Sequence, residues 1–164
     1  MSVKYFEKQN RDIMATEVRA PARADRIDLF LAGGIPDVDD WQASVIERLV
    51  DIPVAIANPR REEPFERSFQ DEQNRWEKEY LAVTDAVLFW FPPQTLCPMT
   101  LFELGVFTMK KETPIFVGAH PDYQRRYDIL IQLSLARPEV VVRESLEATV
   151  ADFRTHWFSR QIDY

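Results

Sequence analysis

The sequence predicts a doubly wound α/β domain, in which about five parallel strands form a sheet with helices on both faces. Short, almost wholly apolar segments alternate along the chain with longer segments whose apolar residues recur at helical spacing. The apolar segments lack the alternating polar residues of a strand with one solvated face, so each is expected to be covered on both faces. With 164 residues, of which 46% are hydrophobic, the chain can bury one core.

The first strand marks where the packed domain is expected to begin. Residues 1–26 mix charges with few periodic apolar positions, so an arm or a peripheral strand is expected there, and the α/β domain is expected over residues 27–164. Residues 27–32 are an apolar run that ends at Gly33 and Gly34, which is typical of a buried strand followed by a tight turn.

The rest of the chain continues the alternation of helix and strand. Trp41, Val45, Ile46 and Leu49 fall on one stripe of the first predicted helix, and Phe69, Trp76, Tyr80 and Val83 recur at helical spacing in the second. The predicted helices cover residues 37–50, 69–83, 101–111, 127–135 and 145–158. The remaining apolar runs predict strands over residues 53–57, 86–91, 114–118 and 139–142.

Charge, cysteine content and hydropathy exclude several classes of partner. The net charge of −7 and the pI near 4.9 argue against a nucleic acid polymer, because a phosphate backbone selects a clustered basic face. The single cysteine, Cys97, excludes a disulfide within the chain, so a cytoplasmic location is expected. No apolar run approaches the ~20 residues of a membrane span, and the first residues lack the apolar region of a secretory signal, so no membrane partner is expected.

In doubly wound sheets the ligand crevice lies beyond the carboxyl ends of the strands. This rule selects residues 33–37, 58–62, 92–103 and 119–128 as candidate site segments. Gly33 and Gly34 could let a backbone approach a sugar or phosphate, or could simply form a turn, and they match neither the dinucleotide fingerprint nor the P-loop. Asn58 and the two arginines after it could bind a base edge and an anion. Alternatively, Asn58 caps a turn and the arginines pair with Glu62, Glu63 or Glu66.

Two glutamates are candidates for glycosidic chemistry, in which one carboxylate is the nucleophile and the other moves the proton. Glu103 could be a partly desolvated nucleophile near a helix start, or the second half of a capping box that begins at Thr100. Glu77 could point along the apolar seam of its helix, or could be a solvated side chain paired with Lys78 or Arg75.

Other reactive or aromatic residues are weaker candidates. Cys97 has no histidine near it in sequence, so a thiol nucleophile is not expected. His120 and His156 are too isolated to suggest a metal site. Trp41, Trp90 and Phe91 could stack on a planar base or belong to the core.

Taken together, these residues resemble the nucleoside 2-deoxyribosyltransferase-like family. The Glu-Leu-Gly block at residues 103–105, with its spacing from the preceding strand, is the most specific part of a resemblance that covers about residues 29–132. The matching blocks are residues 29–35 with 40–42, residues 58–61, residues 76–77 with 85–86, and residues 89–92 with 101–105, and a weaker fifth block comprises residues 120–123 with Arg126 and Asp128.

The resemblance implies a flavodoxin-like fold and cleavage or transfer at the N-glycosidic bond of a 2'-deoxynucleoside or a related nucleoside or nucleotide. It places the nucleophile at Glu103, which would form a glycosyl-enzyme ester, and the acid–base residue eight positions before Asp85, at Glu77. A polar residue that a neighbouring subunit often donates falls at Asp128, so a homo-oligomer with sites near the subunit interface is expected. No cofactor and no metal are implied.

The resemblance also assigns the substrate side of the site, with three departures from the family pattern. Phe30 stands where a supporting tyrosine is usual, Cys97 where Asp or Ser contacts the sugar or phosphate, and Pro36 where nucleotide-cleaving members carry Arg. These departures leave open an alternative, a non-catalytic nucleotide-binding or sensing module on the same fold. The expected substrate-binding residues are Phe30, Gly33, Gly34, Trp41, Gln42, Asn58, Arg60, Trp90 and Cys97.

Overall fold

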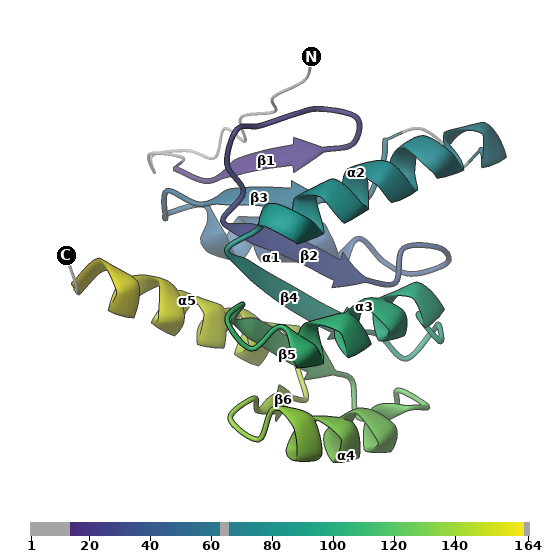
Figure 1. Ribbon diagram of the computed structural model, residues 1–164, viewed down its shortest axis with the longest axis vertical. Helices are drawn as coiled ribbons and strands as arrows, with labels where there is room; N and C mark the ends of the chain where they lie inside the picture. Colours follow the sequence, from purple (N-terminus) through teal and green to yellow (C-terminus); the bar gives the residue numbers. More distant parts are fainter. Residues whose placement is uncertain (1–13, 63–65, 163–164) are drawn as a thin grey trace. The chain divides into compact units, whose positions relative to one another are not determined.

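A computed structural model describes residues 14–62 and 66–162 of the chain, and Figure 1 shows its strands and helices. The chain divides into two compact units. The first comprises residues 1–31 and 42–85, and the second comprises residues 32–41 and 86–164. In the described part of the chain, no helix has both the length and the apolar character needed to cross a membrane.

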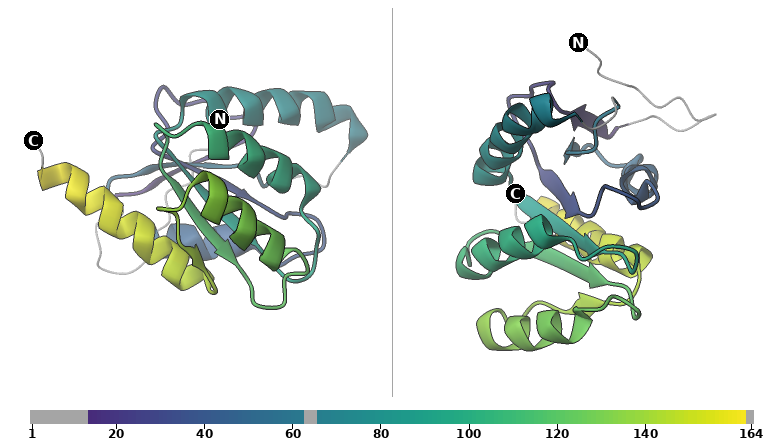
Figure 2. Two further views of the ribbon diagram at one scale, coloured as in Figure 1. Left: turned by 60° about the horizontal axis from the view of Figure 1, so that its bottom comes forward. Right: turned by 90° about the vertical axis from the view of Figure 1, so that its right-hand side faces the viewer.

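The first unit is a parallel sheet segment with one helix on each face. Its strands are β1 (Thr16–Arg19), β2 (Leu29–Gly33) and β3 (Ala55–Asn58), and its helices are α1 (Trp41–Leu49) and α2 (Gln70–Val83), with a 3₁₀ turn over Arg67–Phe69 before α2. β3 lies between β1 and β2 and pairs with both in parallel, with Thr16 opposite Ala55 and Leu29 opposite Ile56. α1 and α2 lie on opposite faces of these strands (Figure 2).

The core of the first unit forms where α2 packs on β2. The ring of Phe30 in β2 is fully buried, and its centroid lies 6.2 Å from that of Trp76 in α2. Trp76 also packs edge-on against Tyr80, one helical turn later, at 4.7 Å. Its indole N–H donates to the carbonyl of Ala22 at 2.8 Å, so the polar end of this large side chain is satisfied.

The second unit contains β4 (Ala86–Phe91), β5 (Ile115–Ala119) and β6 (Val142–Arg143), all parallel, in the order β4-β5-β6. Helices α3 (Pro98–Met109) and α4 (Arg126–Ala136) lie on one face of these strands, and α5 (Leu146–Ile162) lies on the other (Figure 2). All six residues of β4 are buried. Close packing here depends on Gly118 in β5, because a Cβ at that position would lie 2.8 Å from the Trp90 ring and 2.1 Å from Thr149 Oγ1.

The α/β class and the flavodoxin-like arrangement of parallel strands and helices are confirmed, but the expected number of strands is corrected from about five to six. The additional strand is β1, which lies in the segment expected to be an arm or a peripheral strand. Two of its four residues, Glu17 and Arg19, are charged, so no apolar run predicts a strand there. Residues 1–13 of the expected arm lie outside the described residues.

Two helix starts also differ from the prediction. α1 begins at Trp41 and not near residue 37, because Asp37 has a left-handed backbone with φ of 58°. α3 begins at Pro98, three residues before the expected start, because proline fits the first position of a helix, where its missing N–H has no intrahelical partner.

Candidate functional site

Three loops at the carboxyl ends of strands lie together in the second unit. A Cβ on Gly34 would lie 2.9 Å from Cys97 Sγ and 2.6 Å from the Thr95 methyl carbon, so only glycine permits this approach. From the loop after β5, the Tyr123 hydroxyl donates to the carbonyl of Leu96 at 2.7 Å. The loops after β2, β4 and β5 are therefore held to one another at this edge of the unit.

The tryptophans at this edge belong to the packing of the loops. A Cβ on Gly33 would lie 2.4 Å from the Trp41 ring and 2.6 Å from the carbonyl oxygen of Trp90. The Trp41 indole N–H donates to the carbonyl of Gly34 at 2.9 Å, which fixes the glycine loop. Trp41, Trp90 and Phe91 are all buried, as the core alternative for these aromatic residues predicts.

Cys97 is a buried thiol at the start of α3. It occupies the N-cap position with a left-handed backbone, φ 51° and ψ 54°, and its Sγ donates to the carbonyl of Thr95 at 3.6 Å. Burial raises the pKa of the Cys97 thiol to about 11, although hydrogen bonds from Gly34 and Thr95 favour the thiolate. At neutral pH the thiol is therefore protonated, which agrees with the expectation that it is not a nucleophile.

The position of Glu103 contradicts the capping alternative. α3 begins at Pro98 with Cys97 as its N-cap, so Thr100 lies inside the first turn and cannot cap the helix. Glu103 lies in the second turn, half-buried, between the exposed Phe102 and the buried Leu104. The helix dipole also acts less on Glu103 than expected, because the electrostatic effect of the dipole falls off within the first turn.

Asp128 lies in the first turn of α4. Its Oδ2 accepts a hydrogen bond from Arg125 at 3.2 Å, and both side chains are exposed. It is therefore available to a ligand or to another protein surface.

Asn58 and Arg60 form a polar cluster at the end of β3 in the first unit. The Asn58 amide is fully buried and donates to Glu17 at 2.7 Å, while its oxygen accepts the Arg60 backbone N–H at 3.0 Å. This is the turn role that was the alternative to base recognition. The Arg60 side chain donates through Nε to Gln42 Oε1 at 3.1 Å, and Gln42 is fully buried.

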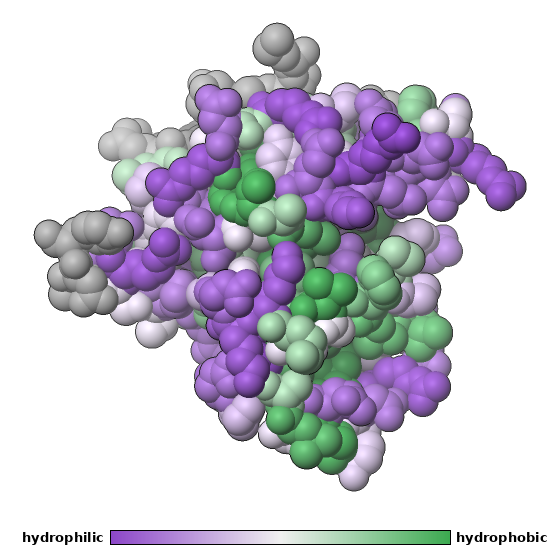
Figure 3. Space-filling view, in the orientation of Figure 1, coloured by the Kyte–Doolittle hydropathy of each residue, from purple (hydrophilic) through white to green (hydrophobic). Residues whose placement is uncertain are grey.

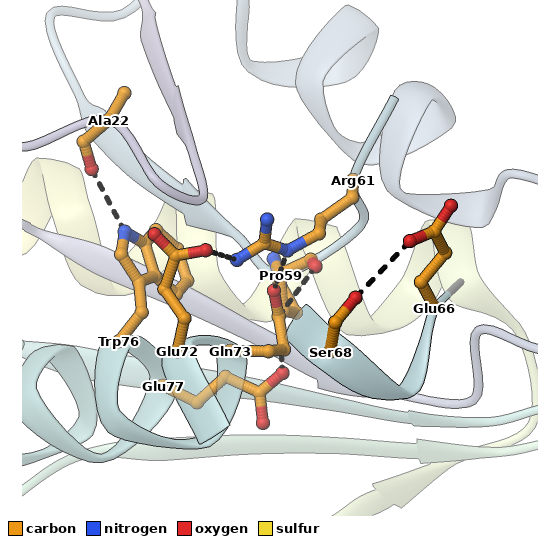
Figure 4. A network of polar contacts seen from close by, with 9 residues as sticks. All are labelled: Ala22, Pro59, Arg61, Glu66, Ser68, Glu72, Gln73, Trp76 and Glu77. Carbon is orange, nitrogen blue, oxygen red and sulfur yellow. Dashed lines mark hydrogen bonds and ion pairs between the residues drawn. The ribbon is translucent and has the colours of Figure 1, made fainter. Parts of the chain in front are cut away.

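Glu77 is a half-buried carboxylate on α2 (Figure 4). Its Oε1 accepts a hydrogen bond from Gln73 Nε2 at 2.6 Å, in place of the surface ion pair with Lys78 or Arg75 that was the alternative. Burial raises the pKa of Glu77, against smaller opposing effects of the Gln73 hydrogen bond and the Arg61 charge. The carboxyl group is thereby shifted toward the protonated form that an acid catalyst requires.

Arg61 is linked to Glu77 by hydrogen bonds through Gln73. Its Nε donates to Gln73 Oε1 at 2.6 Å, and its terminal nitrogen donates to Glu72 at 2.9 Å. Sequence reasoning expected Arg61 to pair with a nearer glutamate, of which Glu63 lies outside the described residues. It missed Gln73 entirely, although four-residue spacing from Glu77 on one helix is a recognisable signal.

Within residues 14–62 and 66–162, no group of three or more His, Cys, Asp or Glu side chains is placed to hold a metal ion. The candidate site offers carboxylates, amides and arginines, and carboxylates can carry out nucleophilic attack and proton transfer.

Comparison with protein-family models finds a match to much of the chain. A family model described as nucleoside 2-deoxyribosyltransferase like matches residues 26–123, which is more than half of the chain. The matched region includes Glu77 and Glu103 and ends before Asp128. A search of curated proteins finds no match.

Proposed function

We propose a function from one premise: this chain belongs to the nucleoside 2-deoxyribosyltransferase-like family. The protein cleaves the N-glycosidic bond of a 2'-deoxynucleoside or a related nucleoside or nucleotide, and passes the glycosyl group to water or to an acceptor base. The observation that carries the proposal is Glu103, because α3 begins too early for this carboxylate to be a helix cap.

In the first half of the proposed reaction, a Glu103 carboxylate oxygen forms a bond to the anomeric carbon of the sugar. The bond between that carbon and the base nitrogen breaks, and its electron pair leaves with the base. Glu77 gives its proton to the departing nitrogen, so the base leaves neutral. The raised pKa of Glu77 supports this role, because it keeps a proton available nearer to neutral pH.

In the second half, water or an acceptor base attacks the anomeric carbon of the glycosyl ester. Glu77, now ionised, takes the proton of the attacking group, and the bond to Glu103 breaks with its electron pair returning to the carboxylate. Both carboxyl groups regain their starting protonation states, so the cycle needs no cofactor.

The expected substrate-binding residues take different parts in the proposal. Arg60, partly exposed and held through Nε by Gln42, is the candidate for a substrate phosphate, and its guanidinium fits an anion. The two packed loops that contain Gly33 and Gly34 and Cys97 are the candidates for contacts with the sugar of the substrate. Of the other expected contacts, Phe30, Trp41, Asn58 and Trp90 are buried and would act by supporting these loops.

The experiment is base release or exchange from a panel of deoxynucleosides, ribonucleosides and their monophosphates, with and without an acceptor base. The wild type should react with at least one substrate, and Glu103→Ala should lose at least about a thousandfold in kcat, as removal of a nucleophile does. Glu112→Ala, which removes an exposed carboxylate just beyond α3, is the matched control. A wild type inert to the whole panel, or an unimpaired Glu103→Ala, refutes the proposal.

The second candidate is a non-catalytic nucleotide-binding or sensing module. It is favoured by Phe30, which has no hydroxyl to support the nucleophile, and by Cys97, whose neutral thiol replaces a usual Asp or Ser. Calorimetry that detects tight nucleotide binding without any base release would support this candidate, whereas stoichiometric release would exclude it.

We further propose that the protein is a homo-oligomer and acts in the cytoplasm. The oligomer is supported by seven large apolar side chains exposed on neighbouring helices of the second unit, here named the α3–α4 face (Figure 3). They are Met99, Phe102, Val106, Met109, Tyr127, Ile131 and Leu135. Asp128 is next to Tyr127 on α4, so an interface on this face would bring Asp128 close to a second copy. A single cysteine, which needs no oxidising compartment, supports the location.

A further inference from the structure

Gln73 bonds through its side chain to both Arg61 and Glu77 in the polar network of α2 (Figure 4). Its Nε2 donates to Glu77 Oε1 at 2.6 Å and to the Pro59 carbonyl at 2.8 Å. Its Oε1 accepts from Arg61 Nε at 2.6 Å. Both hydrogens of the amide and one oxygen lone pair are therefore used.

These partners fix which end of the amide faces Glu77. If the amide were turned over, its oxygen would face the Pro59 carbonyl oxygen and the Glu77 carboxylate, and its NH₂ group would face the Arg61 donor. The contacts with Pro59 and Arg61 would be repulsive whatever the protonation state of Glu77, and the contact with Glu77 would be repulsive when its carboxylate is ionised. Gln73 can thus donate a hydrogen bond to Glu77 but cannot accept one.

We propose that Gln73 is a positioning residue for the acid–base carboxylate. It reserves Oε1 of Glu77 as a hydrogen-bond acceptor, so that Oε2 is the oxygen that carries the transferable proton. The inference rests on the proposed function for its catalytic meaning, but the hydrogen-bond arrangement itself does not depend on it. Gln73 touches no reacting atom in this account and acts only through Glu77.

The same contact holds the carboxylate in one orientation. Gln73 and Glu77 are four residues apart on α2, so they lie on one face of the helix in consecutive turns. Gln73 is in turn anchored to Pro59 and Arg61, which follow β3, so the rotamer of Glu77 is set from a second element.

Charge acts on Glu77 in the same network. Arg61 is the cation that favours the ionised form of Glu77, and Glu72 partly balances that cation through its own contact at 2.9 Å. The charge of Arg61 reaches Glu77 across the Gln73 amide and not by a direct ion pair. Burial is therefore the largest influence on the pKa of Glu77, and it favours the protonated carboxyl group.

The test measures Glu77 itself. In protein labelled with ¹³C at the glutamate carboxyl carbons, the Glu77 signal is assigned by its loss in Glu77→Gln and is titrated in the wild type and in Gln73→Met. Methionine keeps the unbranched shape and helix propensity of glutamine but cannot donate. The pKa of Glu77 should rise by about one unit, because a hydrogen bond that favours the charged form is lost. Gln70→Met, an exposed position on the same helix, should leave it unchanged.

Infrared difference spectra report which oxygen is protonated. In the wild type, the carbonyl oxygen of protonated Glu77 is Oε1 and accepts a hydrogen bond, so its C=O band should move to higher wavenumber in Gln73→Met. Arg61→Met, which frees the Gln73 amide to turn over, should also raise the pKa of Glu77. Because loss of the Arg61 charge raises that pKa by itself, Gln73→Leu, which likewise cannot donate, decides the matter if Gln73→Met does not fold.

An unchanged or lowered Glu77 pKa, or an unmoved C=O band, overturns the positioning role. That result is distinct from failure of the proposed function, because the titration needs no substrate. If the wild type releases base, Gln73→Met should move the alkaline limb of the pH profile of kcat/KM upward with the Glu77 pKa, because base release needs protonated Glu77. An impaired rate with an unmoved profile would point to a merely structural role.

Discussion

At the residue scale, the two glutamates and the cysteine show how position sets the chemistry of a side chain. Cys97 and Glu103 lie six residues apart around the start of α3, yet the thiol is buried and protonated while the carboxylate is half-buried in the second helical turn. Glu77, on α2, is shifted by burial toward the form that can donate a proton. The proposed function assigns attack to Glu103 and acid catalysis to Glu77, which is the division of roles that glycosidic chemistry requires.

The Cys97 thiol is expected to resist alkylation in the folded protein. A pKa of about 11 in place of 9.0 leaves roughly a hundredfold less thiolate at pH 8, and the thiolate is the reactive form. Iodoacetamide labelling at pH 8, followed by mass spectrometry, should therefore be at least about a hundredfold slower in native than in urea-unfolded protein. Equal labelling rates in the two states would show that the thiol is neither buried nor shifted.

At the element scale, the second unit depends on an arginine that joins α4 to the end of α3. Arg137 follows the last residue of α4 and is almost fully buried. It donates to the carbonyls of Phe107 at 3.1 Å, Lys110 at 3.3 Å and Thr113 at 3.5 Å, and it also pairs with Glu139. The carbonyls at the end of a helix have no intrahelical partner, so Arg137 satisfies groups that α3 leaves open.

Arg137→Met is expected to lower the free energy of unfolding by about 2–4 kcal/mol, because buried carbonyls lose their donors. Urea denaturation followed by circular dichroism measures the change. Lys111→Met, which removes an exposed cation near the same helix end, should stay within about 0.5 kcal/mol of wild type. Equal stability of the two variants would mean that the buried donor network contributes nothing.

The sequence predicts elements well where the cause is local. Apolar runs and helical spacing locate β4 and α2 closely, since Ala86 to Phe91 is a strand as expected and α2 ends at Val83. The prediction fails where a single backbone conformation or a partner from another element decides. Asp37 adopts a left-handed conformation that no spacing reveals. The choice between an arm and a peripheral strand stayed open for β1, which is an edge strand through its pairing with β3.

The residues of the candidate site show the same contrast between local sequence patterns and contacts from other elements. Glu77, Glu103 and Asp128 could be named from motif spacing and family resemblance. The contacts of Gln73 with Pro59 and of Tyr123 with Leu96 join residues from different elements, so only the folded structure reveals them. The capping alternative for Glu103 failed because Pro98 moves the helix start by one turn.

At the scale of the whole molecule, the acidic chain exposes a group of large apolar side chains on α3 and α4. The side chains of the α3–α4 face are exposed by 41% to 77%. Together they present on the order of 800 Å², about what one partner contributes to a standard interface and more than the roughly 300–600 Å² patch of a typical monomer. The proposed homo-oligomer would use this face, because burial of apolar side chains favours association, whereas a net charge of −7 opposes it.

The double substitution Met109→Glu with Leu135→Glu should weaken self-association at least tenfold, because two carboxylates per copy would be buried at the contact. Light scattering coupled to gel filtration over a range of protein concentrations measures the mass. Val83→Glu, an exposed apolar residue at the end of α2 in the first unit, is the control and should leave the mass unchanged. A wild type that is monomeric at all concentrations would exclude this interface.

The most direct test of the proposed chemistry is a search for the covalent intermediate. The protein is mixed with each nucleoside or nucleotide of the panel, quenched in acid within seconds, digested and examined by tandem mass spectrometry. The account predicts a peptide heavier by one glycosyl group, with the modification on Glu103, and its accumulation in Glu77→Gln, which cannot take the proton of the attacking group. Base release without any adduct on Glu103, or an adduct on another residue, would contradict the account.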